Sequence, residues 1–196
     1  MDQFRGYIIS INPYKDSSLM VNLLTQETLI SFEVKGRNKI QEYRNRLFSY
    51  GDFLLYKGPT KYYKLKEDKI ISPLYYENLP IDKLLTLDLI SEITLKVLQY
   101  ERSSDEIYDL LSFTIDNLKE IDYKNLILYY IFNMLKIIGA NVENDDKFID
   151  ADYKIDKSFL LSTISKESFA YLLQIFNRIL FETGEISLKS IENFIN

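Results

Sequence analysis

The sequence predicts an α+β protein in which an N-terminal β-barrel precedes an all-α helical domain. Up to about residue 76, short alternating or β-branched runs are separated by turn residues, which is typical of β-strands. Beyond residue 82 the apolar residues recur with helical spacing. The charge changes as well, from 12 Lys and Arg against 9 Asp and Glu in residues 1–80 to 12 against 20 in residues 81–196.

Five runs in the first part have the composition of strands. They are "FRGYIISI", "SLMVNLLT", "LISFEVKG", "DFLLYKG" and "YYKLKEDKIIS". In "LISFEVKG" the apolar Ile30, Phe32 and Val34 fall on one face, which predicts a strand with one buried side. Five such strands over residues 1–78 predict a small closed or nearly closed barrel.

The remaining residues, 79–196, are predicted to form four or five packed helices. Apolar residues recur four apart within a segment of about 82–100, at Leu85, Leu89, Ile93 and Val97. Capping and stop signals mark the later helices at Ser103 with Glu106, at Gly139, and at Ser165 with Gly184.

The composition argues against several classes of function. The chain has 196 residues with no cysteine and no histidine, so disulfides, thiolate zinc sites and the most common general base are excluded. Nucleotide-binding glycine motifs and the serine-hydrolase motif are absent. No apolar run reaches the roughly 18 residues of a membrane span, and "MDQFRGY" lacks the pattern of a signal peptide. We therefore expect a cytoplasmic protein that is not an enzyme and has no cofactor.

A group of carboxylates in "NVENDDKFIDADYKID" is the densest acidic cluster. Its members are Glu143, Asp145, Asp146, Asp150 and Asp152. The cluster lacks the glycine and the terminal glutamate of an EF-hand, so a solvated acidic loop is the favoured interpretation and no metal is expected. A hydrolytic enzyme built on these carboxylates is the disfavoured alternative.

The basic residues are concentrated in one segment, although the net charge is -5. Residues 35–69 contain 10 basic residues against 4 acidic ones. A nucleic acid responds to local charge density rather than to the total, so this segment is a candidate contact surface. An ordinary solvated surface is the alternative.

The N-terminal segment "FRGYIISINPYKDSSLMVNLLT", followed by "ISFEVKGRNK", resembles the opening of the RecO family of bacterial recombination mediators. The matching positions are Gly6, Tyr14, Asp16, Ser17, Thr25 and Gly36. Farther along, "LILYYIFNMLKIIGANVE" and "LFETGEISLKSIENFI" are similar to later segments of that family, so the resemblance covers almost the whole chain. Two features depart from the family: no glycine follows "LLT", and the acidic segment stands where many RecO proteins carry a four-cysteine zinc element. We therefore do not expect zinc.

The resemblance implies that residues 1–78 form an oligonucleotide-binding (OB) barrel. Such barrels use cations to follow phosphates and aromatic rings to stack on bases. The residues nominated as DNA contacts are Lys35, Arg37, Lys39, Arg44, Arg46, Lys57, Lys61, Tyr62 and Lys64. Tyr14 and Lys15 in the first turn are further candidates, with packing of Tyr14 on the barrel end as an equal alternative.

The resemblance also implies the function and the partners. A RecO protein would bind single- and double-stranded DNA, anneal complementary strands without ATP, and assist recombinase loading near the bacterial nucleoid. The implied partners are RecR, the acidic, apolar-ended tail of the single-strand DNA-binding protein and, indirectly, RecA, with no membrane. Arg178 and Lys189 lie nearest to dense apolar helix surface and are nominated for that tail. The alternative is a protein-interaction adaptor whose basic barrel binds an acidic partner.

Overall fold

The computed structural model describes residues 1–74, 78–98, 104–140, 158–184, 188–191 and 194. The chain divides into two compact units. Met1–Asn78 with Ser103–Tyr108 forms the first, and Leu79–Arg102 with Asp109–Asn196 forms the second.

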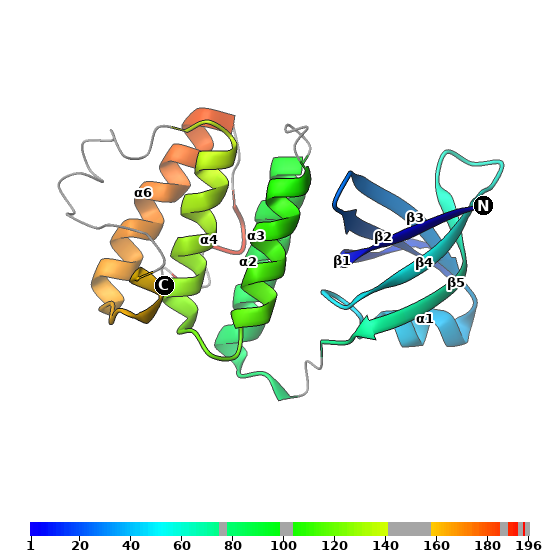
Figure 1. Ribbon diagram of the computed structural model, residues 1–196, viewed down its shortest axis with the longest axis horizontal. Coiled ribbons are helices and arrows are strands. Elements are labelled where there is room, and N and C mark those ends of the chain that lie inside the picture. Colours follow the sequence, from blue (N-terminus) through cyan, green and yellow to red (C-terminus); the bar gives the residue numbers. More distant parts are fainter. Residues whose placement is uncertain (75–77, 99–103, 141–157, 185–187, 192–193, 195–196) are drawn as a thin grey trace. The chain divides into compact units, whose positions relative to one another are not determined.

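The strands of the first unit form a closed barrel (Figure 1). In the described part of this unit they are β1 (Asp2–Lys15), β2 (Ser18–Thr25), β3 (Leu29–Lys35), β4 (Tyr50–Lys57) and β5 (Tyr63–Ser72). They follow one another in the order β1-β2-β3-β5-β4, and β4 pairs back onto β1. Every pairing is antiparallel except β3 with β5, where Phe32 pairs with Tyr63 and Glu33 with Lys64. The predicted fold class, α+β with an N-terminal five-stranded barrel followed by helices, is confirmed.

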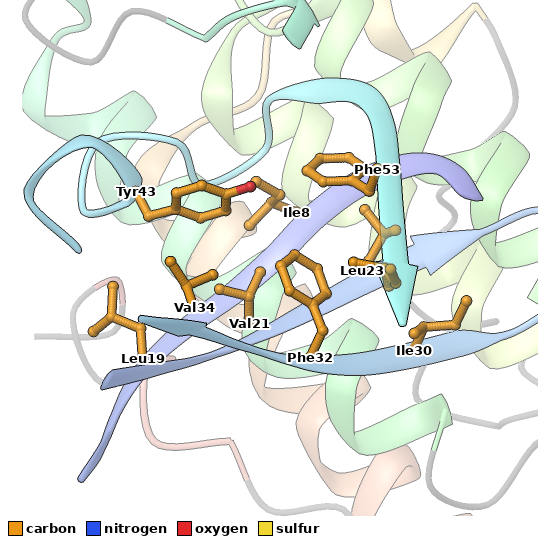
Figure 2. Packing of buried hydrophobic residues seen from close by; sticks show 10 residues of the cluster. Ile8, Leu19, Val21, Leu23, Ile30, Phe32, Val34, Tyr43 and Phe53 are labelled. Atoms are coloured by element: carbon orange, nitrogen blue, oxygen red, sulfur yellow. The ribbon is translucent and has the colours of Figure 1, made fainter. Parts of the chain in front are cut away.

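The barrel core follows from the alternation of apolar and polar residues along each strand. Phe32 of β3 and Phe53 of β4 are fully buried, and their ring centroids lie 5.7 Å apart. Figure 2 shows both rings among Ile8, Val21 and other apolar side chains that several strands contribute. Because replacing a buried phenylalanine by alanine costs about 3–5 kcal/mol, such residues contribute strongly to the stability of the barrel.

A short helix, α1 (Arg37–Tyr43), connects β3 to β4, where the sequence predicts only a connection. Its apolar residues, Ile40 and Tyr43, are too few to produce a helical period. Tyr43 is fully buried in the barrel core 6.3 Å from Phe32, measured between ring centroids (Figure 2). Gly36 precedes the helix with φ +93°, a conformation that other residues avoid. The stretch "VKGRNK" is therefore a strand end, a glycine turn and the first turn of a helix.

The rest of the described chain is helical. Its elements are α2 (Ile81–Leu98), α3 (Ser104–Asn117), α4 (Tyr123–Ile137), the 3-10 helix η3 (Phe159–Leu161) and α6 (Lys166–Gly184). Helix α4 packs against α2, α6 and η3. Tyr130 of α4 is completely buried, and its hydroxyl lies 2.5 Å from Oγ1 of Thr94 on α2.

The helix boundaries agree with the signals in the sequence. At the end of α4, Gly139 has φ +77°, and the amide of Ala140 donates to the carbonyl of Leu135 at 2.9 Å. This bond closes the helix in the Schellman manner. At the start of α6, the Ser165 hydroxyl accepts a hydrogen bond from the amide of Ser168 at 3.1 Å, as an N-cap does. Ser103, expected to cap α3, lies outside the described residues.

Candidate nucleic-acid interface

Two loops meet at one end of the barrel. Tyr14 lies at the end of β1, just before the β1–β2 turn, and Tyr62 closes the connection from β4 to β5. Their ring centroids are 5.8 Å apart in an edge-to-face arrangement. Nζ of Lys15 lies 5.0 Å from the centroid of the Tyr14 ring, and Nζ of Lys61 lies 4.9 Å from that of Tyr62. We call these four residues the tyrosine pair and its lysines. OB barrels contact oligonucleotides with these two loops.

A second cationic feature is a pocket of about 190 Å³ on the barrel, which we call the lysine pocket. It is lined by Lys35, Lys39, Lys64 and Lys66, together with Glu33, Tyr56 and Leu65. Lys64 of β5 pairs with Glu33 on one side and with Tyr56 on the other, so the pocket spans three neighbouring strands. Phe32 and Val34 point into the core, which places Glu33 and Lys35 on the outer face of β3.

Asp68 of β5 engages two of the nominated cations. Its side chain is 3% exposed; Lys39 donates to Oδ1 at 3.0 Å, and Arg46 forms an ion pair with Oδ2. Burial alone would raise the pKa of Asp68, but the hydrogen bonds from Lys39 and Arg46 outweigh it and hold that pKa below its usual value. Glu42 pairs with both cations as well. Lys39 and Arg46 therefore hold α1 and the segment after it against β5, and a phosphate would have to compete with carboxylates for them.

The other nominated cations are more accessible. Arg37 begins α1 and Arg44 caps its end; both are exposed, and neither is paired with a carboxylate in the described part of the chain. Lys35 is exposed, with Nζ 3.5 Å from Oε1 of Glu33. Lys57 is exposed at the end of β4 with Nζ 5.7 Å from the centroid of the Tyr63 ring.

Lys66 is not among the DNA contacts predicted from the sequence, yet it lines the lysine pocket beside Lys64. Residues two apart on a strand point to the same face, so the run "YKLKED" already placed Lys64 and Lys66 together. Charge alternation along β5 was therefore the signal that could have identified Lys66.

The residues nominated for partner binding lie on different elements of the second unit. Arg178 is on α6, with Nη1 3.8 Å from Oε1 of Glu182. Lys189 follows α6, and its amide donates at 2.8 Å to Glu92 of α2, which also accepts from Lys96. Burial would raise the pKa of Glu92, but these bonds and one from the amide of Ser190 hold it at about 2.

An apolar pocket of about 210 Å³ lies elsewhere in the second unit. It is lined by Ile81, Asp82, Leu85, Tyr123, Lys166, Phe169 and Phe194. It thus combines aromatic surface with one cation, Lys166. The sequence predicts this combination around Arg178 and Lys189 instead. Lys166 and Phe169 are three residues apart at the start of α6 and so share a face of that helix.

The described residues contain no group of three or more His, Cys, Asp or Glu placed to hold a metal ion. The acidic cluster from Glu143 to Asp152 lies outside those residues. Among the helices that the structure describes, none is long and apolar enough to cross a lipid bilayer.

Comparisons with known proteins agree with the resemblance. The family model for the C-terminal part of recombination protein O matches residues 80–149. DNA repair protein RecO of Francisella tularensis subsp. novicida is 25% identical over 203 residues, covering 94% of this chain and 84% of that protein. These matches support the predicted resemblance to the RecO family. DNA repair protein RecO of Francisella philomiragia is 26% identical over 164 residues, covering 81% of this chain and 67% of that protein.

Two solved structures are far more distant from this chain. Asparaginyl-tRNA synthetase from Entamoeba histolytica, in complex with asparaginyl-adenylate, aligns at 14% identity with a TM-score of 0.30, over 50% of this chain and 31% of that one. The enzyme from Pyrococcus horikoshii aligns at 5% identity with a TM-score of 0.31, over 88% and 67%. Scores of this size do not establish a common fold.

Proposed function

We propose that the chain is a DNA repair mediator that binds single- and double-stranded DNA, anneals complementary strands without ATP and assists recombinase loading together with RecR. Similarity to RecO proteins supports a role in DNA repair, since both relatives are DNA repair proteins by name. RecA is then an indirect partner, and the protein acts in the bacterial cytoplasm near the nucleoid.

The observation that carries the proposal is the tyrosine pair with its lysines. Two aromatic rings and two ammonium groups meet where the β1–β2 and β4–β5 loops approach each other. Bases stack on aromatic rings at about 1–3 kcal/mol per base, and lysines attract the phosphates between them. Neither contact reads base edges, so binding depends little on sequence.

Annealing in this proposal requires positive charge rather than a catalytic group. Two complementary strands repel each other through their phosphates until base pairs form. Exposed cations at the barrel, such as Lys35, Arg37 and Arg44, lower that repulsion by neutralising phosphates on both strands. No nucleotide needs to be hydrolysed in such a step.

The apolar pocket of the second unit supports a proposed site for the tail of the single-strand DNA-binding protein. An acidic tail with an apolar end needs apolar surface with a cation beside it, and Phe169 with Lys166 supplies both. Asp82 in the same pocket works against binding of an acidic tail. Arg178 and Lys189 remain the residues that the sequence predicts to bind this tail. Tail-peptide binding to Lys166→Glu and to Arg178→Glu with Lys189→Glu distinguishes the two locations.

Fluorescence anisotropy with labelled single-stranded oligonucleotides tests the DNA-binding proposal. The variant Lys35→Glu with Arg37→Glu and Arg44→Glu leaves Lys39 and Arg46 in place, because those two are already paired with Asp68. We expect weaker binding and a salt dependence that is flatter by about two units of logarithmic slope, since each single-strand phosphate contact contributes about -0.7. Wild-type affinity that does not change with salt would contradict the proposal.

Two matched measurements complete this test. Lys119→Glu reverses an exposed charge in the second unit and should leave DNA affinity unchanged. The pair Tyr14→Ala with Tyr62→Ala should weaken binding without changing the salt slope, because it removes stacking and keeps the lysines. If wild type bound an acidic peptide but no oligonucleotide, the adaptor alternative would replace the DNA proposal.

A further inference from the structure

The lysine pocket differs from the exposed cations around it because its charges converge on one cavity. Lys35 comes from β3, Lys64 and Lys66 from β5, and Lys39 from α1. Tyr56 of β4, with 38% of its surface exposed, adds a hydroxyl group that can donate a hydrogen bond. The cavity is therefore lined mainly by donors.

The side chains that line the lysine pocket carry more positive charge than negative charge. Lys39 and Arg46 share the carboxylates of Asp68 and Glu42, two positive charges against two negative ones, so Lys39 adds nothing to the excess. Lys35, Lys64 and Lys66 then stand against Glu33, which is three positive charges against one negative charge, an excess of two. The structure records no carboxylate partner for Lys64 or Lys66 among the residues it describes; Nζ of Lys66 has a contact of 3.6 Å with the weakly accepting sulfur of Met1.

Glu33 is the second unusual feature of the pocket. Its side chain is 3% exposed, and its buried Oε1 makes no hydrogen bond in the described structure. The ammonium group of Lys35 lies 3.5 Å from this oxygen as an ion pair. Glu33 therefore holds the outward-facing Lys35 beside the pocket by charge alone, which leaves the donors of Lys35 available to a ligand.

The size of the cavity limits the ligand. A volume of about 190 Å³ is below the roughly 300 Å³ of common small-molecule sites. A phosphate group fits this space. An internal phosphodiester has one negative charge and chain on both sides, while a phosphate monoester has close to two charges and chain on one side only.

We propose that the lysine pocket binds a phosphate monoester, as found at the phosphorylated end of a DNA strand. Its two negative charges match the excess of two positive charges, and its single attachment lets it enter a concave site. The inference deepens the proposed DNA binding, in which the tyrosine pair holds the neighbouring single strand. The barrel then distinguishes a phosphorylated strand end from the interior of the same strand.

The test compares the affinity of the full chain for three oligonucleotides of one sequence: 5′-phosphorylated, 3′-phosphorylated and unphosphorylated. We expect one phosphorylated form to bind about tenfold more tightly than the unphosphorylated form. The reason is that its phosphate forms three partly exposed ion pairs, with Lys35, Lys64 and Lys66. Lys64→Gln with Lys66→Gln should remove this preference. Lys69→Gln, a lysine of the same strand outside the pocket, should keep it. Glu33→Gln removes the negative charge and should enlarge the preference.

A titration with phenyl phosphate makes the inference independent of DNA binding. Saturable binding to wild type that is lost in Lys64→Gln with Lys66→Gln supports the pocket even if no oligonucleotide binds, in which case only the proposed function fails. Binding of phenyl phosphate without any end preference assigns the pocket to free phosphate esters and overturns its role at DNA ends. Equal affinities for all three oligonucleotides, together with no binding of phenyl phosphate, overturn the inference completely.

Discussion

At the scale of single residues, Asp68 determines which cations of the barrel are available to a ligand. Its two carboxylate oxygens engage Lys39 and Arg46, which the sequence alone presents as equal to Lys35 and Arg37. The difference arises because Asp68 lies 29 residues from Lys39 in the chain and reaches it only through the fold. Charge counting along a sequence cannot distinguish a paired cation from an unpaired one.

We expect Asp68→Asn to destabilise the barrel by about 2–3 kcal/mol at neutral pH, because two partly buried cations lose their carboxylate. The pKa of Asp68 is lower when folded than when unfolded, so its stabilisation is complete above the unfolded value of about 3.9 and is lost as pH falls through the folded value. Urea unfolding of wild type and variant measures both effects. Equal stabilities at pH 7 would show that the network contributes nothing.

At the scale of elements, α1 depends on the glycine that precedes it. A Cβ on Gly36 would meet no atom within 4 Å, so its φ of +93° is the main obstacle to substitution. We expect Gly36→Ala to cost about 1–2 kcal/mol in thermal or urea unfolding, from the strain of that conformation. Gly58→Ala in the β4–β5 connection is a useful comparison, because φ there is not positive and a Cβ would meet the flexible end of Lys64. A larger loss for Gly58→Ala would contradict the argument.

A second element prediction concerns the segment after α6. Glu92 of α2 accepts hydrogen bonds from the amides of Lys189 and Ser190, which fastens that segment to α2. Its folded pKa of about 2 lies below the ordinary value of 4.5, so the stabilisation is present above about pH 4.5 and declines toward pH 2. Glu92→Gln should cost about 2 kcal/mol at pH 7 and progressively less in acid. A constant difference between pH 7 and pH 3 would exclude this linkage.

The sequence predicted the strands and long helices well because each carries a repeating apolar pattern. It missed α1, whose seven residues offer only Ile40 and Tyr43 to such a pattern. It also did not distinguish the roles of the basic residues: Lys66 was overlooked, and the contact between Tyr14 and Tyr62 joins residues 48 positions apart. These features depend on strand register and barrel closure, which a local pattern does not contain.

At the scale of the whole molecule, the chain is expected to fold without zinc. It has no cysteine or histidine, and carboxylates alone seldom form a closed tetrahedral zinc site. Thermal unfolding before and after exhaustive chelation should give the same Tm, and elemental analysis should find no stoichiometric zinc. Retained zinc with a Tm that falls on chelation would locate a metal centre that the composition argues against.

The parallel pairing of β3 with β5 has a consequence for the motions of the barrel. Two register pairs join these strands, Phe32 with Tyr63 and Glu33 with Lys64, whereas longer antiparallel ladders form the other junctions. We expect the barrel to open most easily at this short pairing of β3 with β5 in local fluctuations of the native state. Lys35 of β3 and Lys64 of β5 both line the lysine pocket, so an anion bound there would bridge the two strands. Binding of an anion in the pocket would then slow the local opening of the barrel between β3 and β5.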